Sequence, residues 1–293
     1  SRLDRMFEHD EVYSPGLAAL AYIFMDPNYW PGPDYRWRIN NPNFHTDMYN
    51  IPLKVGALMP DHPHAKRWLK WGRDETHGDL MRNSYPGGAW QESLSYSGYV
   101  FHMVDNARIV RDSGLVDPFA EWPRMKEVLT YLAAMHTPVD PRYGSRQKAP
   151  IGDTSPGNYI EELRECATDY RGVDDRFAEQ LARFPDSWEH ALDLGSREFF
   201  GFGAMMRGSQ YDARHESFLT VKAGPARNHY QGDELSFYFA SLGTPLAIDY
   251  ACHYSPRPWH AAMHNRPDMT DKRPVAIAVR RAMKTSDAAD VFV

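Results

Sequence analysis

The sequence predicts two domains in series, a helical domain followed by an antiparallel β domain. From about residue 10 to residue 195, apolar residues recur at helical spacing in segments of ten to twenty residues, separated by Pro and Gly. After Gly195 the apolar period changes to two, which is typical of strands. We therefore expect a helical domain over residues 1–195 and a β-sandwich over residues 196–293, with an interface of the kind that commonly holds an active site.

The predicted helices follow from apolar spacing and from the residues at their ends. One is expected over residues 63–80 and another over residues 91–112. A third begins at Pro123, a residue suited to the first turn of a helix. Two more are expected over residues 159–169 and 175–183.

The predicted strands follow from alternation. Leu219 and Val221 fall on one face of a strand. Phe237 and Leu246 lie in two further strands that flank a turn at Gly243. The short connection predicts that these two strands are antiparallel.

Composition restricts the class of protein. The chain has 293 residues, of which 42% are hydrophobic and 25% charged, as in a soluble globular protein. The net charge of -6 argues against a surface that attracts nucleic acid or an anionic membrane over its whole area. Two cysteines exclude a disulfide framework and a Cys-rich zinc module.

The ends and the missing motifs add further expectations. No segment approaches the roughly 18 apolar residues of a membrane span. The start has neither an initiator Met nor the apolar segment of a signal peptide, so we expect a trimmed N-terminus and leave a cut C-terminus open. A Gly-rich phosphate loop, His-Glu-x-x-His and Gly-x-Ser-x-Gly are all absent, which argues against nucleotide chemistry and triad hydrolysis.

A polar and aromatic cluster lies at the start of the helix predicted over residues 91–112. On a helix, Glu92, Tyr96 and Tyr99 share one face, so that a carboxylate and two phenols come together. A phenol beside a suitable partner acts as a general acid or base. Spacing alone favours another interpretation, in which the tyrosine rings pack along one side of the helix and their hydroxyls reach solvent.

A second polar group lies near residue 43. Asn43 and His45 are two residues apart, a pair able to bind an anionic group and transfer a proton. On spacing alone, a helix cap made by Thr46 or Asp47 is the favoured alternative.

A third group follows the predicted strands. Gln231, Asp249 and His264 would give a mixed nitrogen and oxygen metal site, for which zinc is the natural ion. On the residues alone, buried hydrogen bonds that tie loops to the sandwich are favoured over metal.

Six segments in this order resemble the heparinase II/III-like polysaccharide lyases, a family that includes related alginate and oligoalginate lyases. The segments are Asn43-Phe-His45, Glu92-Ser-Leu-Ser-Tyr96 with Tyr99, Pro150-Ile-Gly-Asp153, His229 to Phe237, Gly243 to Asp249, and His264-Asn265. The resemblance covers nearly the whole chain. It implies an incomplete (α/α) toroid followed by an antiparallel β-sandwich, with substrate in the cleft between them.

The resemblance also implies an activity, β-elimination on a uronic-acid polysaccharide of the heparin, heparan sulfate or alginate type. In that reaction the C5 proton is removed, the C4 oxygen leaves and an unsaturated sugar remains. Donors must neutralise the adjacent carboxylate before the C5 proton becomes acidic.

Site roles are carried over from the family residue by residue. Asn43 resembles the carboxylate neutraliser, and His45 a second neutraliser or the base. Tyr96 resembles the acid that protonates the leaving oxygen, and in some geometries also the base. His229 resembles the base or a carboxylate ligand, and Glu92 a group that orients the others.

Substrate, metal and location complete the expectations. The candidate substrate contacts are Glu92, Tyr99, Arg227 and Arg257. The two arginines are included because Arg suits bidentate recognition of anions. Many relatives carry a His at the position of Gln231, so the resemblance leaves Asp249 and His264 as the matching ligands of a structural zinc. The expected partner is an anionic polysaccharide, and the family resemblance implies a periplasmic or secreted protein.

Three other functions stay open at this point. A uronate C5-epimerase shares abstraction of the C5 proton but returns it. A non-catalytic carbohydrate-binding protein would keep the fold without turnover. A hydrolase on a helical toroid would need a second catalytic carboxylate beside Glu92.

Overall fold

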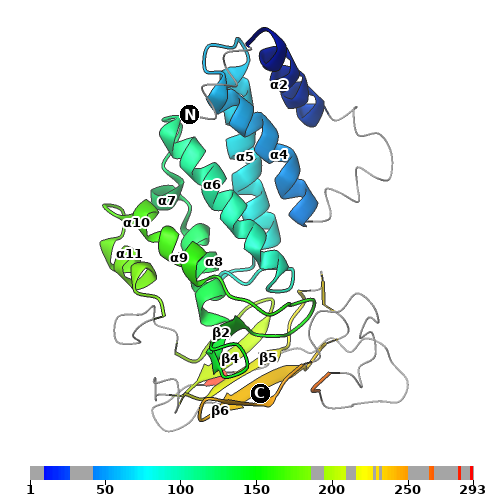
Figure 1. The fold of residues 1–293 in the computed structure, drawn as a ribbon, viewed down its shortest axis with the longest axis vertical. Helices are drawn as coiled ribbons and strands as arrows, with labels where there is room; N and C mark the ends of the chain where they lie inside the picture. The colour runs from blue at the N-terminus through cyan, green and yellow to red at the C-terminus, as the bar shows by residue number, and fades with distance from the viewer. Residues whose placement is uncertain are drawn as a thin grey trace, which may run out of the picture. The chain divides into compact units, whose positions relative to one another are not determined.

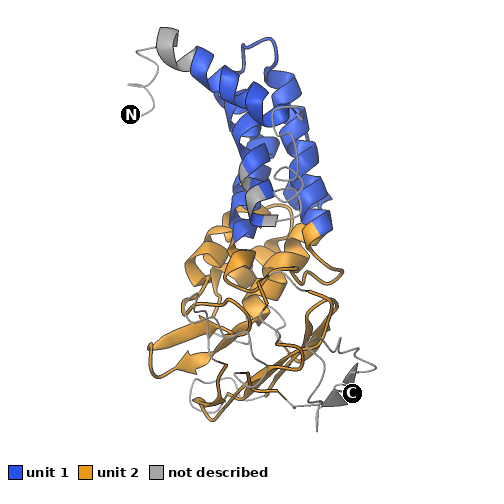
Figure 2. Ribbon diagram, turned by 90° about the vertical axis from the view of Figure 1, so that its right-hand side faces the viewer, with its two compact units in different colours: residues 1–82, 99–122 blue, residues 83–98, 123–293 orange. Residues whose placement is uncertain are grey.

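The computed structural model describes residues 10–26, 42–185, 195–208, 216–226, 229–230, 233–249, 264–266, 283–284 and 291–292. Within these ranges the helices precede the five-stranded antiparallel sheet, as the sequence predicts, but one antiparallel hairpin lies among the helices (Figure 1). None of the helices in these ranges is both long and apolar enough to span a membrane. The chain forms two compact units (Figure 2): unit 1 comprises residues 1–82 and 99–122, and unit 2 comprises residues 83–98 and 123–293.

Unit 1 is helical where it is described. Its elements are α2 (Asp10–Met25), α4 (Pro42–Leu58), α5 (Ala65–Asn83), α6 (Tyr99–Asp112) and α7 (Pro118–Glu121). A core of Ala21, Val55 and Trp68 joins α2, α4 and α5. At Gly72 of α5, an added Cβ would lie 2.5 Å from the Cβ of Leu53 in α4. Glycine at this position therefore allows the two helices to approach closely.

Unit 2 combines helices with antiparallel sheets. Its helices are η1 (Tyr96–Gly98), α8 (Pro123–Ala134), α9 (Ile160–Glu165), α10 (Ala167–Tyr170) and α11 (Asp175–Ala182). Its strands are β1 (His136–Asp140), β2 (Ser145–Lys148), β3 (Arg197–Phe199), β4 (Gly203–Arg207), β5 (Phe218–Lys222), β6 (Phe237–Ser241), β7 (Thr244–Ala247), β8 (Met283–Lys284) and β9 (Val291–Phe292). Strands β1 and β2 form a hairpin, β3 to β7 form one sheet in sequence order, and β8 pairs with β9.

Most of the predicted helices are confirmed. The helix expected over residues 63–80 is α5, the one beginning at Pro123 is α8, and the one over residues 175–183 is α11. The helix expected over residues 159–169 is divided at Cys166 into α9 and α10.

The hairpin β1–β2 was not predicted, because it lies inside the segment expected to be helical. Pro138 and Pro141 interrupt a helical ladder, and Gly144 turns the chain with a φ of 65°.

The predicted helix over residues 91–112 is wrong in its first part. Regular helix begins only at Tyr99, after the short turn η1. The Ser97 hydroxyl donates to the carbonyl oxygen of Ser93 at 3.0 Å, and the Tyr159 hydroxyl donates to that of Leu94 at 2.6 Å. Side chains of this kind compete with helical backbone bonds. Glu92, Tyr96 and Tyr99 therefore do not share the face of one helix, the arrangement predicted from their spacing.

The five-stranded sheet confirms the predicted alternation, with a different face buried. In β5 the side chains of Phe218, Thr220 and Lys222 are buried, whereas Leu219 and Val221 are half-buried. A second sheet layer and the closure of the helices into a toroid stay predictions.

A buried charge cluster joins the hairpin to this sheet. Arg207 of β4 contacts Glu216, and Nη2 of Arg146 in β2 lies 2.8 Å from Oε2 of the same carboxylate. Arg207 also donates to the carbonyl oxygen of His136 at 2.8 Å. Burial lowers the pKa of Arg207 from its usual value to about 10, and the carboxylate of Glu216 opposes that effect. These contacts fix the hairpin against the sheet.

Candidate active site

Unit 2 brings together Glu92, Tyr96, Asp153 and His229. The segment that carries Tyr96 is tied down by Tyr159, whose hydroxyl lies 2.6 Å and 2.9 Å from the carbonyl oxygens of Leu94 and Ser95. The carboxylate of Glu92 is fully buried and accepts a hydrogen bond from Nε1 of Trp90 at 3.3 Å. The segment is therefore held on both sides of Ser93.

His229 stands in a strained backbone conformation. Its φ is 59°, a value that few residues other than glycine adopt. The carbonyl oxygen of His229 accepts from the amide of Asp153 at 2.8 Å. Gly152 lies against this peptide, since an added Cβ would lie 2.8 Å from the same carbonyl oxygen. Local strain of this kind persists where the surrounding contacts determine the conformation.

The imidazole of His229 lies between two carboxylates. Nδ1 is 3.3 Å from Oδ2 of Asp153, and Nε2 is 3.6 Å from Oε1 of Glu92. A carboxylate only accepts, so the hydrogen of the shorter contact belongs to Nδ1. In this tautomer the lone pair is on Nε2, the nitrogen on the side of Glu92.

Tyr96 lies flat on the same imidazole. The two ring centroids are 3.4 Å apart and the rings are inclined by 11°. The side chain of His229 is 22% exposed and Tyr96 is partly exposed, so both rings are accessible to a ligand. The pair offers a phenol hydroxyl and an imidazole nitrogen, two groups that carry out general acid and base catalysis.

Asp153 was not singled out as a functional residue by sequence reasoning. Its Oδ1 is buried and has no hydrogen-bond partner in the described part of the chain. Orphaned buried acceptors are uncommon in native structures. The only available signal was its place at the end of Pro150-Ile-Gly-Asp153, one of the segments that resemble the family. Tyr230 was also missed, although its hydroxyl donates to the carbonyl oxygen of Glu92 at 3.3 Å.

Unit 1 contains the other predicted proton-transfer group, His45. Its Nδ1 lies 2.8 Å from Oδ1 of Asp79, and its Nε2 lies 3.5 Å from Glu75. Asp79 is buried and also accepts from the hydroxyls of Thr46 and Tyr49, each at 3.0 Å. Thr46 lies inside α4, which begins at Pro42, and its hydroxyl binds a side chain of α5, whereas the alternative favoured on spacing placed Thr46 or Asp47 at a helix cap.

The remaining unit 1 candidates are Asn43 and Tyr99. Asn43 is buried in the first turn of α4. Tyr99 begins α6, where its ring lies 5.3 Å from that of His102.

The predicted metal ligands are described in part. Nδ1 of His264 lies 2.8 Å from Oδ1 of Asp249, and both side chains are buried. Gln231 lies outside the described residues, as do the candidate substrate contacts Arg227 and Arg257. The described residues contain no group of three or more His, Cys, Asp or Glu able to hold a metal ion.

Comparison with known proteins supports the fold. The sequence matches no protein-family model and no curated protein. The structure is similar to heparan sulfate lyase HepC from Pedobacter heparinus, with a TM-score of 0.62 and 16% identity, over 84% of this chain and 36% of that chain. It is also similar to a heparinase III described as the BT4657 gene product, with a TM-score of 0.65 and 17% identity, over 93% of this chain and 48% of that chain.

A further structure described as heparinase III has a TM-score of 0.55 and 14% identity, over 81% of this chain and 42% of that chain. The chain thus spans between about a third and a half of the length of these enzymes. At these identities the likeness establishes a heparinase-like fold.

Proposed function

We propose that the chain carries catalytic residues of a polysaccharide lyase that cleaves a uronic-acid polymer by β-elimination. The observation that carries the proposal is the stacked pair of Tyr96 and His229, with Asp153 on Nδ1 of the imidazole. The heparinase-like fold supports the same class of reaction.

His229 is the proposed base. With the Nδ1 hydrogen directed to Asp153, Nε2 accepts the C5 proton of the uronate. The electron pair of the broken C5–H bond forms the C4=C5 double bond as the C4–O4 bond breaks. Donors on the uronate carboxylate stabilise the charge that develops at C5. Asn43 and His45 are proposed for that role on the family resemblance.

Tyr96 is the proposed acid. Its hydroxyl gives a proton to the departing O4, so the leaving sugar ends with a free hydroxyl and the other ends with the unsaturated uronate. Return of the C5 proton from His229 to the phenolate, through solvent, restores the starting state. Because the two rings are stacked, both groups approach the sugar from the same side.

The substrate and its location belong to the same proposal. An anionic polysaccharide of the heparan sulfate or alginate type is an extracellular polymer, and we therefore propose a secreted or periplasmic protein. The structural zinc at Asp249 and His264 stays a prediction from the family resemblance, and no step of the proposed elimination uses it.

The test is an ultraviolet assay for the conjugated double bond of the unsaturated uronate. Heparan sulfate, heparin, alginate, chondroitin sulfate, hyaluronan and ulvan are each incubated with the protein and with Tyr96→Phe. We expect absorbance to rise on one polymer and the variant to abolish that rise. Folded protein that produces no double bond, while exchanging the C5 proton with deuterated solvent, would identify an epimerase and overturn the lyase proposal.

A further inference from the structure

Unit 2 contains a small pocket, with a volume of about 60 Å³, that no proposed catalytic residue lines. Its walls come from the hairpin β1–β2, from β6 and from the chain after β7, with Arg142, Tyr143, Lys148 and Tyr238 among the lining residues. This volume is below the roughly 300–1,000 Å³ of small-molecule sites, so the pocket admits a single carboxylate or sulfate group, and the sugar ring that carries the group stays at its mouth.

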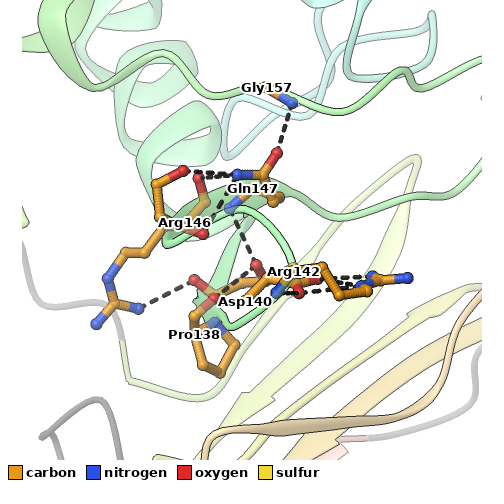
Figure 3. A network of polar contacts seen from close by, with 8 residues as sticks. Pro138, Asp140, Arg142, Arg146, Gln147 and Gly157 are labelled. Carbon is orange, nitrogen blue, oxygen red and sulfur yellow. Dashed lines mark hydrogen bonds and ion pairs between the residues drawn. The ribbon is translucent and has the colours of Figure 1, made fainter.

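The hairpin wall is held in one conformation by its own hydrogen bonds. The Arg142 guanidinium donates to both carboxylate oxygens of Asp140, with Nη2 at 2.6 Å, as Figure 3 shows. Oε1 of Gln147 accepts from the amide of Gly157 at 2.7 Å and joins the hairpin to the following loop (Figure 3). The pocket is therefore largely preformed, which lowers the entropic cost of binding a ligand.

Two cations, Arg142 and Lys148, and two carboxylates, Asp140 and Asp249, line the pocket. The carboxylate of Asp140 is matched by Arg142, and that of Asp249 is bound to His264. Lys148 takes part in none of the ion pairs between described residues, and its ammonium instead lies 4.6 Å from the centre of the Tyr159 ring. Burial lowers the pKa of Lys148 from 10.5, and the charge of Glu162 opposes this effect. A partly desolvated ammonium in a pocket favours an anionic ligand.

The pocket also offers apolar surface of the kind that sugar rings contact. The ring of Tyr143 is 50% exposed, and Ile248 is 45% exposed. Tyrosine combines a flat apolar face with a polar tip, which suits the apolar face and the hydroxyl rim of a saccharide.

Short contacts connect the pocket to the catalytic segment. The ring beneath the Lys148 ammonium is that of Tyr159, whose hydroxyl holds the carbonyl oxygens just before Tyr96. Pro150 and Pro156, which line the pocket, stand on either side of Asp153 in sequence. The pocket and the catalytic residues of unit 2 are thus built on the same two segments.

We propose that this pocket is a sugar subsite, in which Lys148 binds the carboxylate or sulfate of a polysaccharide unit near the one that is cleaved. The inference rests on the proposed function and adds to it a residue that determines preference for anionic sugars. Tyr143 supplies the surface on which the sugar ring packs.

The test is equilibrium binding by calorimetry, with Tyr96→Phe as the parent so that the ligand is not consumed. A heparan sulfate hexasaccharide, its desulfated form and neutral cellohexaose are titrated into the parent and into Lys148→Gln. We expect Lys148→Gln to weaken binding of an anionic ligand about tenfold, which is typical of a charge-assisted contact. Lys148→Arg should restore most of the affinity, and cellohexaose should show no difference between the parent and Lys148→Gln.

Lys126→Gln is the matched control. Lys126 also lies over an aromatic ring, 4.9 Å from the centre of Phe177, but it is outside the pocket and paired with Asp174. Its loss should leave the affinity unchanged. If the desulfated hexasaccharide keeps the dependence on Lys148, the bound group is a carboxylate, and if the dependence disappears, the bound group is a sulfate.

Equal affinity of the parent and Lys148→Gln for both anionic ligands, or no binding of either, would overturn the subsite. The lyase proposal fails separately, through the absence of a double bond in the ultraviolet assay. Binding that depends on Lys148 without any turnover would keep the subsite and reject the lyase.

Discussion

The phenol ring of Tyr96 lies face to face with the imidazole of His229, with 3.4 Å between the ring centroids. Stacking of this kind positions two proton-transfer groups without a hydrogen bond between them. Removing only the Tyr96 hydroxyl therefore tests its role in catalysis while the stacking of the two rings is kept.

We expect Tyr96→Phe to reduce kcat by roughly 10²–10⁴-fold, the usual contribution of a general acid or base. The phenylalanine ring still stacks on His229, so the melting temperature should stay at the wild-type value. Initial rates of double-bond formation and a thermal scan measure the two effects. Tyr22→Phe, which removes the hydroxyl of a tyrosine that is 43% exposed on α2, is the control with unchanged rate. A Tyr96→Phe enzyme of wild-type activity would exclude Tyr96 as the acid.

Asp153 is predicted to act through the tautomer of His229. In Asp153→Asn the new amide group is able to donate to Nδ1, which moves the imidazole hydrogen to Nε2 and removes the proposed base. We expect kcat/KM to fall by about 10²-fold or more, and the imidazole ¹⁵N resonances to report the change of tautomer. Asp112→Asn, at a carboxylate that is 72% exposed, should change neither quantity. An unchanged ¹⁵N spectrum together with reduced activity would show that Asp153 has another role.

The sequence predicted the order of elements better than the site. Helices α5, α8 and α11 were predictable because their apolar spacing and terminal residues are local signals. The link between Asp153 and His229 was not, since it joins side chains 76 positions apart and depends on a left-handed residue at 229. The family resemblance identified Tyr96 and His229 as candidates, whereas their stacking is a tertiary feature.

The misplaced start of α6 has a similar cause. A helical period continues through Glu92 and Tyr96, but serine hydroxyls and the distant Tyr159 compete for the backbone there. In the segment before Tyr96, tertiary contacts therefore outweigh the local preference for helix. Such conflicts between local and global preference are expected at functional sites.

Gly152 and Gly172 form a matched pair for testing the support of His229. Both have positive φ, 71° and 79°, so alanine should cost about 1–2 kcal/mol of unfolding free energy at either position. At Gly172 an added Cβ meets nothing within 4 Å, whereas at Gly152 it meets the carbonyl oxygen of His229 and the side chain of Ser93. Gly152→Ala should therefore lose a further ~1–3 kcal/mol in urea unfolding, and turnover as well. Equal losses for the two variants would show that the loop around His229 adjusts freely.

Asp79 is predicted to be a stability determinant of unit 1. Its buried carboxylate accepts from His45, Thr46 and Tyr49. Burial, followed by the charge of Asp79, holds the pKa of Tyr49 well above its usual value, so the phenol stays a donor. Asp79→Ala leaves these buried groups without their acceptor, and we expect a loss of about 2–4 kcal/mol in urea unfolding. Asp74→Ala, at an exposed carboxylate of the same helix, should change stability by less than about 0.5 kcal/mol. Similar losses for the two variants would contradict this role.

The free energy of unfolding is predicted to depend on pH through His136. Burial lowers its pKa from 6.5 to about 3, and the charges of Arg146 and Arg207 act in the same direction. Its Nδ1 donates to the carbonyl oxygen of Leu132, and its Nε2 accepts from the amide of Tyr159 at 2.9 Å, so protonation would break the second bond. Below pH 6.5 the unfolded chain binds a proton that the folded chain does not, so stability falls as pH decreases from 6.5 towards 3.

Between pH 7 and pH 5 this single group should remove about 2 kcal/mol of unfolding free energy. The quantity is measured by urea unfolding of the wild type and of His136→Gln, which does not titrate in this range. The carboxyl groups contribute equally to both proteins, so the difference between the two pH slopes isolates His136. Because Tyr159 holds the backbone before Tyr96, low pH should also loosen the catalytic segment. Equal slopes for the two proteins would mean that His136 is protonated in the folded state as readily as in the unfolded chain.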